Sequence, residues 1–204
     1  GEMLMLKDCH RGVVRNLGFE SAGSDRSLPD GNYTVISLVG DQSDLEFNGC
    51  RLRGFMHGIS HLHGEKTSRR VTIRGCQFVD GGDLGQQALG ADGAAVSGIG
   101  DDWLVEDNYF DDCALGIEVE NTAKLLPIQR VIIRGNRLLN VRNLGIVAWM
   151  GGIPEATNAL HQSDIVVRNN LVVGKWPRHV DPRGDTVPVM NISINGGSRW
   201  IIQG

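Results

Sequence analysis

The feature that most constrains the fold of this chain is a short pattern of strands and corners that recurs along its length. The clearest copy is VIIRGNRLLNVRNLGIVAW, residues 131–149. In this copy a strand runs into a corner at Gly135-Asn136, a second strand follows, and a third strand ends at Trp149. Side-chain alternation along these strands predicts one shared inward face, made by Val131, Ile133, Leu138, Ile146 and Ala148.

The other copies align on the corner residue, at intervals of about 26 to 35 residues. That position holds residues that tolerate a positive φ angle: Asn16, Gly49, Gly75, Asp107, Gly135, Asn169 and Gly204. The next position predicts an inner ladder of stacked side chains: Leu17, Cys50, Cys76, Asn108, Asn136 and Asn170. One coil cannot bury its own inner face, so the coils have to stack. The alternation excludes helical repeats and predicts an all-β parallel solenoid of about six to seven coils.

Four segments then point to a family. VTIRGCQF, WLVEDNYF, VIIRGNRL and IVVRNNLV resemble the repeats of right-handed parallel β-helix proteins, the pectate-lyase-like superfamily. The resemblance covers nearly the whole chain, and it implies a right-handed β-helix that is secreted or displayed at the cell surface and acts on carbohydrate. Lyases, hydrolases, epimerases, phage tailspikes and adhesins share this fold, so the chemistry has to be argued from individual residues.

Length and composition limit the fold and function classes to which the chain can belong. The 204 residues fit one domain, 1–204, and we expect a fragment of a longer protein because the chain opens inside a strand and stops at the corner residue Gly204. A net charge of −4 with both signs dispersed argues against a nucleic-acid surface. The sequence contains no apolar run of about 18 residues, which predicts that no segment spans a membrane. Cys50 and Cys76 are expected to be free buried thiols.

The longer insertions fall on the two sides of one predicted sheet, whose strands include 115–121 and 144–149. Loops lengthened around one sheet predict the walls of a groove. Strict alternation gives the groove floor, coil by coil, as Ser60 and Leu62, Ala95 and Ser97, Glu118 and Glu120, Val147 and Trp149, and Asn191, Ser193 and Asn195.

Glu118 and Glu120 are the predicted catalytic residues. Residues i and i+2 on one strand face lie about 6.5–7 Å apart at Cα, a spacing at which two carboxyl groups can straddle a glycosidic bond. Two carboxylates this close raise one pKa, which yields one acid and one base. Trp149, one coil away, is predicted to stack against a sugar ring. The alternative is that the two glutamates form an ordinary solvated strand face.

The same Glu-x-Glu pair resembles the calcium-binding pair of β-helix lyases that act on uronate polymers, which implies Ca²⁺ at Glu118 and Glu120 as the alternative to a protein without a cofactor. Lys124 resembles the basic catalyst of those enzymes. The arginine that they carry on the following strand is missing here, and Arg142 lies in a turn nearby. The sequence therefore favours hydrolysis over elimination.

Two further clusters lie near the predicted groove. The segment 174–188 predicts a substrate-contacting wall, with Arg178, His179, Asp181 and Arg183 as its binding residues, and the alternative is a solvated loop. His57, His61 and His63 include a His-x-His spacing that suits zinc. Because the register places His61 inside, packing is the favoured interpretation.

A second sheet carries two outward columns. One is charged and contains Arg15, Arg74, Glu106, Arg134 and Arg168. The other is an apolar stripe formed by Leu104, Ile132, Val166 and Ile201, which predicts a contact with another subunit or a missing segment. Two functions remain open at this point: cleavage of a polysaccharide in the groove, or a non-catalytic β-solenoid that binds glycans or forms a trimeric tailspike or adhesin.

Overall fold

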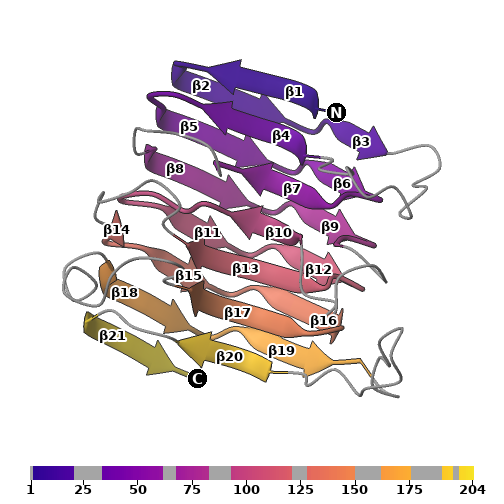
Figure 1. The fold of residues 1–204 in the computed structure, drawn as a ribbon, viewed down its shortest axis with the longest axis vertical. Coiled ribbons are helices and arrows are strands. Elements are labelled where there is room, and N and C mark those ends of the chain that lie inside the picture. Colours follow the sequence, from indigo (N-terminus) through magenta and orange to yellow (C-terminus); the bar gives the residue numbers. More distant parts are fainter. Residues whose placement is uncertain are drawn as a thin grey trace.

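Three all-parallel sheets run along the molecule, and the chain passes through them in turn (Figure 1). The computed structural model describes residues 2–20, 34–61, 68–82, 93–120, 128–149, 162–175, 190–194 and 198–204, without the side chains of Glu2, Glu120 and Trp149. The resulting parallel β-helix has about seven coils, which confirms the predicted fold class. Among the described residues no helix is present that could cross a membrane.

Each of the first six coils contributes to sheet A, then to sheet B and then to sheet C, and the described part of the last coil contributes β20 to sheet A and β21 to sheet B. Sheet A contains β1 (Glu2–Lys7), β4 (Thr34–Val39), β7 (His57–Ser60), β10 (Ala94–Ser97), β13 (Leu115–Glu120), β17 (Leu144–Trp149) and β20 (Met190–Ile194). Sheet B contains β2 (His10–Arg15), β5 (Ser43–Asn48), β8 (Arg69–Arg74), β11 (Leu104–Glu106), β14 (Ile128–Gln129), β15 (Ile132–Arg134), β18 (Gln162–Arg168) and β21 (Ser198–Gln203). Sheet C contains β3 (Gly18–Glu20), β6 (Arg51–Arg53), β9 (Gln77–Val79), β12 (Tyr109–Asp111), β16 (Arg137–Val141) and β19 (Leu171–Gly174).

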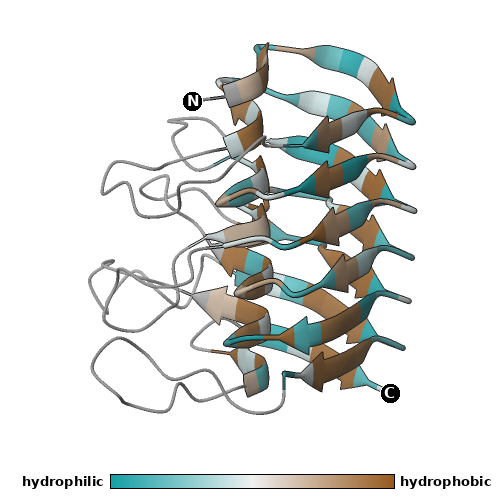
Figure 2. Cartoon of the chain, turned by 90° about the vertical axis from the view of Figure 1, so that its right-hand side faces the viewer, coloured by the Kyte–Doolittle hydropathy of each residue, from teal (hydrophilic) through white to brown (hydrophobic). Residues whose placement is uncertain are grey.

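The corner between sheets B and C has the predicted backbone conformation. Its residues have φ angles from 53° to 65° in six coils, at Asn16, Gly49, Gly75, Asp107, Gly135 and Asn169. Only residues that accept the left-handed region suit this position, which explains why Gly, Asn and Asp hold it. Hydrophobic segments recur on successive strands down the axis (Figure 2).

The inner ladder beside this corner is confirmed. Asn136 Nδ2 donates to Asn170 Oδ1 at 2.9 Å, and Asn108 Nδ2 donates to Asn136 Oδ1 at 3.0 Å. On the earlier coils the same position holds buried Cys50 and Cys76, and both are free thiols as predicted. The asparagine ladder therefore satisfies buried polar groups from coil to coil, as a buried amide requires.

The hydrophobic core fills the inside of the helix between the three sheets. Its largest members include Trp103, Phe47, Phe78 and Phe110, and the rings of Phe78 and Phe110 stack with centroids 4.8 Å apart. Trp103 is 1% exposed, so its large ring lies fully inside the core. Trp200 lies on the last strand and packs against the core while partly exposed.

Alternation fails at one position of sheet A. The second residue of consecutive strands is small, at Gly58, Ala95, Gly116 and Gly145, and it faces inward together with the residue after it. A Cβ atom on Gly116 would lie 2.3 Å from Leu138 Cδ2, and one on Gly145 would lie 2.4 Å from Val172 Cγ1. This small column makes room for the large inner residues of sheet C. The prediction that Ala95 lies on the outer face is therefore wrong, because two successive residues point inward here.

Candidate functional site

The outer face of sheet A carries the predicted catalytic strand, β13. Ile117 and Val119 are both fully buried in the core, so Glu118 between them points outward, as predicted. The Glu118 side chain is partly exposed. In the backbone register, Glu118 pairs with Val147 and Glu120 pairs with Trp149 on the next coil. The strand geometry thus brings together the positions predicted for the two carboxylates and the aromatic platform.

The floor around Glu118 is more covered than the sequence predicts. One column of outward residues runs through Ser37, Ser60, Ser97, Glu118, Val147 and Ser193. Ser60, Ser97 and Val147 are 2%, 0% and 2% exposed, and Ser97 Oγ donates to Ser60 Oγ over 3.1 Å. The expectation of an open floor on these coils is therefore wrong. Glu118 is the partly exposed member of this stretch, between two buried neighbours.

Apolar packing accounts for part of this burial. Ala94, Ala114, Leu115 and Val147 form a small hydrophobic cluster of their own, with Leu144 packed against it. The cluster lies apart from the main core and includes Val147, the residue directly beside Glu118. Glu118 therefore has an apolar neighbour on the next coil.

Arg142, predicted to contact substrate, lies inside the protein. The residue is 3% exposed, and its guanidinium donates to the carbonyl oxygens of Gly81 and Asp112 at 2.5 and 2.6 Å. It also lies 3.1 Å from the carboxylate of Asp112. These contacts hold the turn between sheets C and A together, so Arg142 is placed where it stabilises the fold.

Asp112, the ion-pair partner of Arg142, was not predicted from the sequence. Asp112 also accepts a hydrogen bond from Lys175 Nζ at 2.8 Å, which joins the fourth and sixth coils. Burial acts to raise the pKa of Asp112, but the Lys175 hydrogen bond and the Arg142 charge outweigh it, and the pKa is lowered. Asp112 and Lys175 lie far apart in sequence, and only the stacking of coils brings them together.

The remaining predicted site residues lie outside the described part of the chain. This holds for Lys124 and for the proposed wall residues Arg178, His179, Asp181 and Arg183. For Glu120 and Trp149 the backbone is described and the side chain is not. Their roles stay predictions.

The histidines favour packing over metal binding. His57 and His61 are each 6% exposed, and His61 Nε2 lies 3.1 Å from the carbonyl oxygen of Gly40. Burial lowers the pKa of His61, so the neutral ring is favoured. Within the described ranges no group of three or more His, Cys, Asp or Glu side chains is arranged to hold a metal ion. Glu118 is the one described carboxylate of the pair, so Ca²⁺ binding there stays a prediction.

Sheet B presents both predicted outward columns in register. Leu104, Ile132, Val166 and Ile201 follow one another on consecutive coils. In the charged column, Glu106 bonds Arg134 at 2.6 Å, whereas Arg74 turns to Glu46 at 2.9 Å. The stripe is partly exposed along its length, and Ile201 is 56% exposed.

Comparisons with protein-family models and with curated proteins find no match to this chain. The β-solenoid architecture is therefore established by the strand register alone.

Proposed function

We propose that this β-helix cleaves glycosidic bonds of a polysaccharide by hydrolysis, with Glu118 and Glu120 as the acid and base pair. The observation that carries the proposal is the geometry of β13, where buried Ile117 and Val119 fix Glu118 on the outer face of sheet A. Two strand positions further on, Glu120 lies in register with Trp149. Paired carboxylates beside an aromatic residue are a chemistry suited to a sugar chain.

Of the two glutamates, we assign the acid role to Glu118. Buried Val147 lies directly beside it, and the apolar cluster continues to Leu115. In this proposal Glu118 donates a proton to the leaving oxygen while Glu120 acts as the base. The resemblance to the pectate-lyase-like superfamily supports a polysaccharide substrate and a secreted or surface location.

Hydrolysis is favoured over elimination by the position of Arg142. Elimination in β-helix lyases, as the sequence resemblance implies, depends on an arginine on the strand after the carboxylates. The nearest candidate here is committed to backbone carbonyl groups and is buried. Its guanidinium is thus held away from the outer face of sheet A.

The test is a panel of acidic and neutral polysaccharides, read for new reducing ends and for the ultraviolet absorbance of unsaturated products. Reducing ends without that absorbance support hydrolysis, and both signals together indicate a lyase. Glu118→Gln and Glu120→Gln should each lower turnover by about 10² to 10⁴, the usual cost of losing an acid or a base.

A matched control is Glu20→Gln, which removes the same charge from an exposed glutamate on β3 of sheet C. It should keep the wild-type rate. An active wild-type protein whose Glu118→Gln and Glu120→Gln variants are equally active would exclude the carboxylate pair.

A second candidate is a non-catalytic β-solenoid that binds glycans or assembles as a tailspike or adhesin. The exposed apolar stripe of Leu104, Ile132, Val166 and Ile201 favours it, because such a surface commonly meets another chain. Failure of wild-type protein to act on every polysaccharide, together with a defined oligomer that Ile132→Lys dissociates, would support this function instead.

A further inference from the structure

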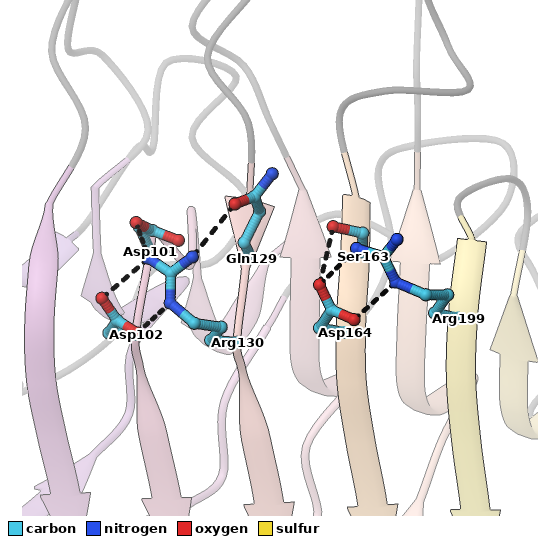
Figure 3. Close-up of polar contacts among 7 residues, drawn as sticks. All are labelled: Asp101, Asp102, Gln129, Arg130, Ser163, Asp164 and Arg199. Atoms are coloured by element: carbon cyan, nitrogen blue, oxygen red, sulfur yellow. Dashed lines mark hydrogen bonds and ion pairs between the residues drawn. The ribbon is translucent and has the colours of Figure 1, made fainter.

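Two exposed arginines on sheet C differ from most arginines of this protein. On sheet B, for comparison, Arg130 and Arg199 each bond an aspartate of the preceding coil through both carboxylate oxygens (Figure 3). On sheet C, Arg51 and Arg137 are exposed, and among the described residues neither guanidinium has a hydrogen-bond or ion-pair partner. These two cations are therefore available to a ligand.

Both arginines belong to one column on the outer face of sheet C. The strand register places Arg51, Gln77, Tyr109 and Arg137 side by side on β6, β9, β12 and β16. Each is the first residue of its strand and is followed by a fully buried core residue, so its own side chain points outward. We refer to these four residues as the sheet C column. Their strands lie one below another along the helix axis (Figure 1).

The sheet C column lies on an accessible part of the surface. Only two residues join sheet B to sheet C on each of these four coils, so no insertion stands at this corner beside the column. Arg51, Gln77 and Arg137 are exposed, and Tyr109 is partly exposed. The column is flanked at its two ends by β3 and β19, so its exposure belongs to the body of the helix.

The side chains of the column suit an acidic sugar chain. A guanidinium can bond a carboxylate or a sulfate group through two parallel N–H groups. The Gln77 amide can both donate to and accept from a hydroxyl group. The ring of Tyr109 offers an apolar face with a polar tip, a combination that fits the face of a sugar ring.

The outward positions next to Tyr109 extend this chemistry. Val79 and Leu139 lie diagonally beside it on the neighbouring coils, and both are partly exposed. Between them, Asp111 accepts hydrogen bonds from Tyr109 Oη at 3.4 Å and from Asn140 Nδ2 at 2.7 Å. Apolar side chains beside a carboxylate suit a ligand that combines C–H faces with hydroxyl groups.

The spacing of the column suits an extended chain. Neighbouring members are one strand spacing apart, about 4.8 Å, so Arg51 and Arg137 are about 14 Å apart at Cα. One sugar residue lengthens an extended glycan by a similar step, so acid groups three residues apart can reach both arginines. An acidic peptide fits this face less well, because the backbone groups of β6, β9, β12 and β16 already pair with both neighbouring strands.

We propose that the sheet C column binds an extended acidic polysaccharide at a surface separate from the cleavage site proposed on sheet A. The glycan lies along the helix axis, with its acid groups on Arg51 and Arg137 and a sugar ring over Tyr109. Gln77 and Asp111 bond its hydroxyl groups. The proposal concerns binding alone, so it holds whether or not the protein cleaves the chain.

The test uses three polymers that share one extended backbone and differ in charge: carboxymethyl cellulose, cellulose sulfate and neutral hydroxyethyl cellulose. Each is attached to a sensor surface, and binding of the whole protein is measured by biolayer interferometry. We expect binding to the acidic polymers and none to the neutral one. The tighter of the two acidic polymers identifies the preferred acid group.

Variants assign the binding to the column. Arg51→Gln and Arg137→Gln should each weaken it about threefold to fivefold, the usual range for an exposed ion pair. The double variant should weaken it by roughly the product of the two effects, since the sites are far enough apart to act independently. The matched control is Arg11→Gln, which removes the same charge from an exposed residue at the end of β2 far from the sheet C corner. It should bind like the wild type.

The proposal is overturned if neither acidic polymer binds, if the neutral polymer binds equally well, or if the double variant binds no more weakly than Arg11→Gln. The cleavage assay keeps this outcome distinct from the fate of the proposed hydrolysis. Inactive protein that still binds through Arg51 and Arg137 removes the hydrolysis and supports this surface. In an active protein the double variant should keep the wild-type rate at saturating substrate, and a lower rate there would contradict a separate surface.

Discussion

Replacing Asn136 by Ala should be among the most destabilising single changes in this protein. Asn136 is fully buried. Its Nδ2 donates to the carbonyl oxygen of Val105 and to Asn170 Oδ1, both at 2.9 Å. Its Oδ1 accepts from the backbone N and from Nδ2 of Asn108, both at 3.0 Å. The substitution therefore removes four hydrogen bonds across three coils.

The size of the effect follows from the fate of those partners. A buried hydrogen bond contributes about 1 kcal/mol net, and a buried group left unpaired costs about 1–3 kcal/mol. Four lost bonds therefore predict a decrease of about 4 kcal/mol in the free energy of unfolding. Asn48→Ala is the control, since its partly exposed side chain makes one described bond, to Glu46 at 3.0 Å, and should cost about 1 kcal/mol.

The assay is urea unfolding followed by circular dichroism, with the slope m compared between variants to confirm that the same transition is measured. Asn136→Asp adds a second test, because it keeps the shape but lacks the amide donors. Burial raises the pKa of a carboxyl group, so the stability of this variant should be highest at low pH and fall as pH rises. A loss below about 1 kcal/mol for Asn136→Ala, equal to that of Asn48→Ala, would refute the idea that the ladder stabilises the stack.

Three further outcomes are expected. Gly116→Ala should lower the free energy of unfolding by about 1–3 kcal/mol, since its Cβ would lie 2.3 Å from Leu138 Cδ2 and 2.6 Å from the carbonyl oxygen of Gly145. Thermal unfolding measures this loss of stability, and Gly18→Ala at an exposed position is the control. The hydrogen bond from Arg70 lowers the pKa of Asp44 to about 2. The stabilisation from this pair is therefore present above about pH 4 and is lost as the pH falls toward about 2. Arg70→Gln should raise the pKa of Asp44, as measured by NMR titration. Burial raises the pKa of Cys76 and Cys113 to about 12, so native protein at neutral pH should alkylate at Cys9 first, whereas early labelling of Cys113 would contradict the burial.

The fold was predictable from the sequence because its signals are local and repeated. The corner residues at Asn16, Gly49 and Gly135 needed a positive φ angle, and each has one. The strand that follows Arg142 was placed with the correct bounds, Leu144–Trp149. Alternation within a strand and the spacing of corners are both properties of a few neighbouring residues, so a single sequence carries them.

The candidate site was only partly predictable, because it depends on how coils pack against one another. Alternation correctly placed Glu118 outward, but it put Ala95 on the wrong face. It could not reveal that the Leu138 and Val172 side chains need a small inner column at Gly116 and Gly145. The sequence placed Arg142 in a turn without indicating its partners. The carbonyl groups of Gly81 and Asp112 lie on the turns of two earlier coils and become neighbours of Arg142 only after the coils stack.

A column of alternating charges on sheet B, the Arg/Asp ladder, consists of Arg11, Asp44, Arg70, Asp102, Arg130, Asp164 and Arg199. It could have been predicted from the sequence, since each member stands five residues before an aligned corner, from Arg11 before Asn16 to Arg199 before Gly204. It was not predicted because these residues have positive φ angles, and the alternation rule for extended strands does not say which face such a residue occupies. Its physical value is specificity. The inner columns of Ile, Val and Phe pack against any neighbouring coil, so they distinguish one register from another poorly. A slip of one coil would set Arg beside Arg and Asp beside Asp along the whole column, so the alternating charges penalise wrong stacking while the apolar core supplies the stability.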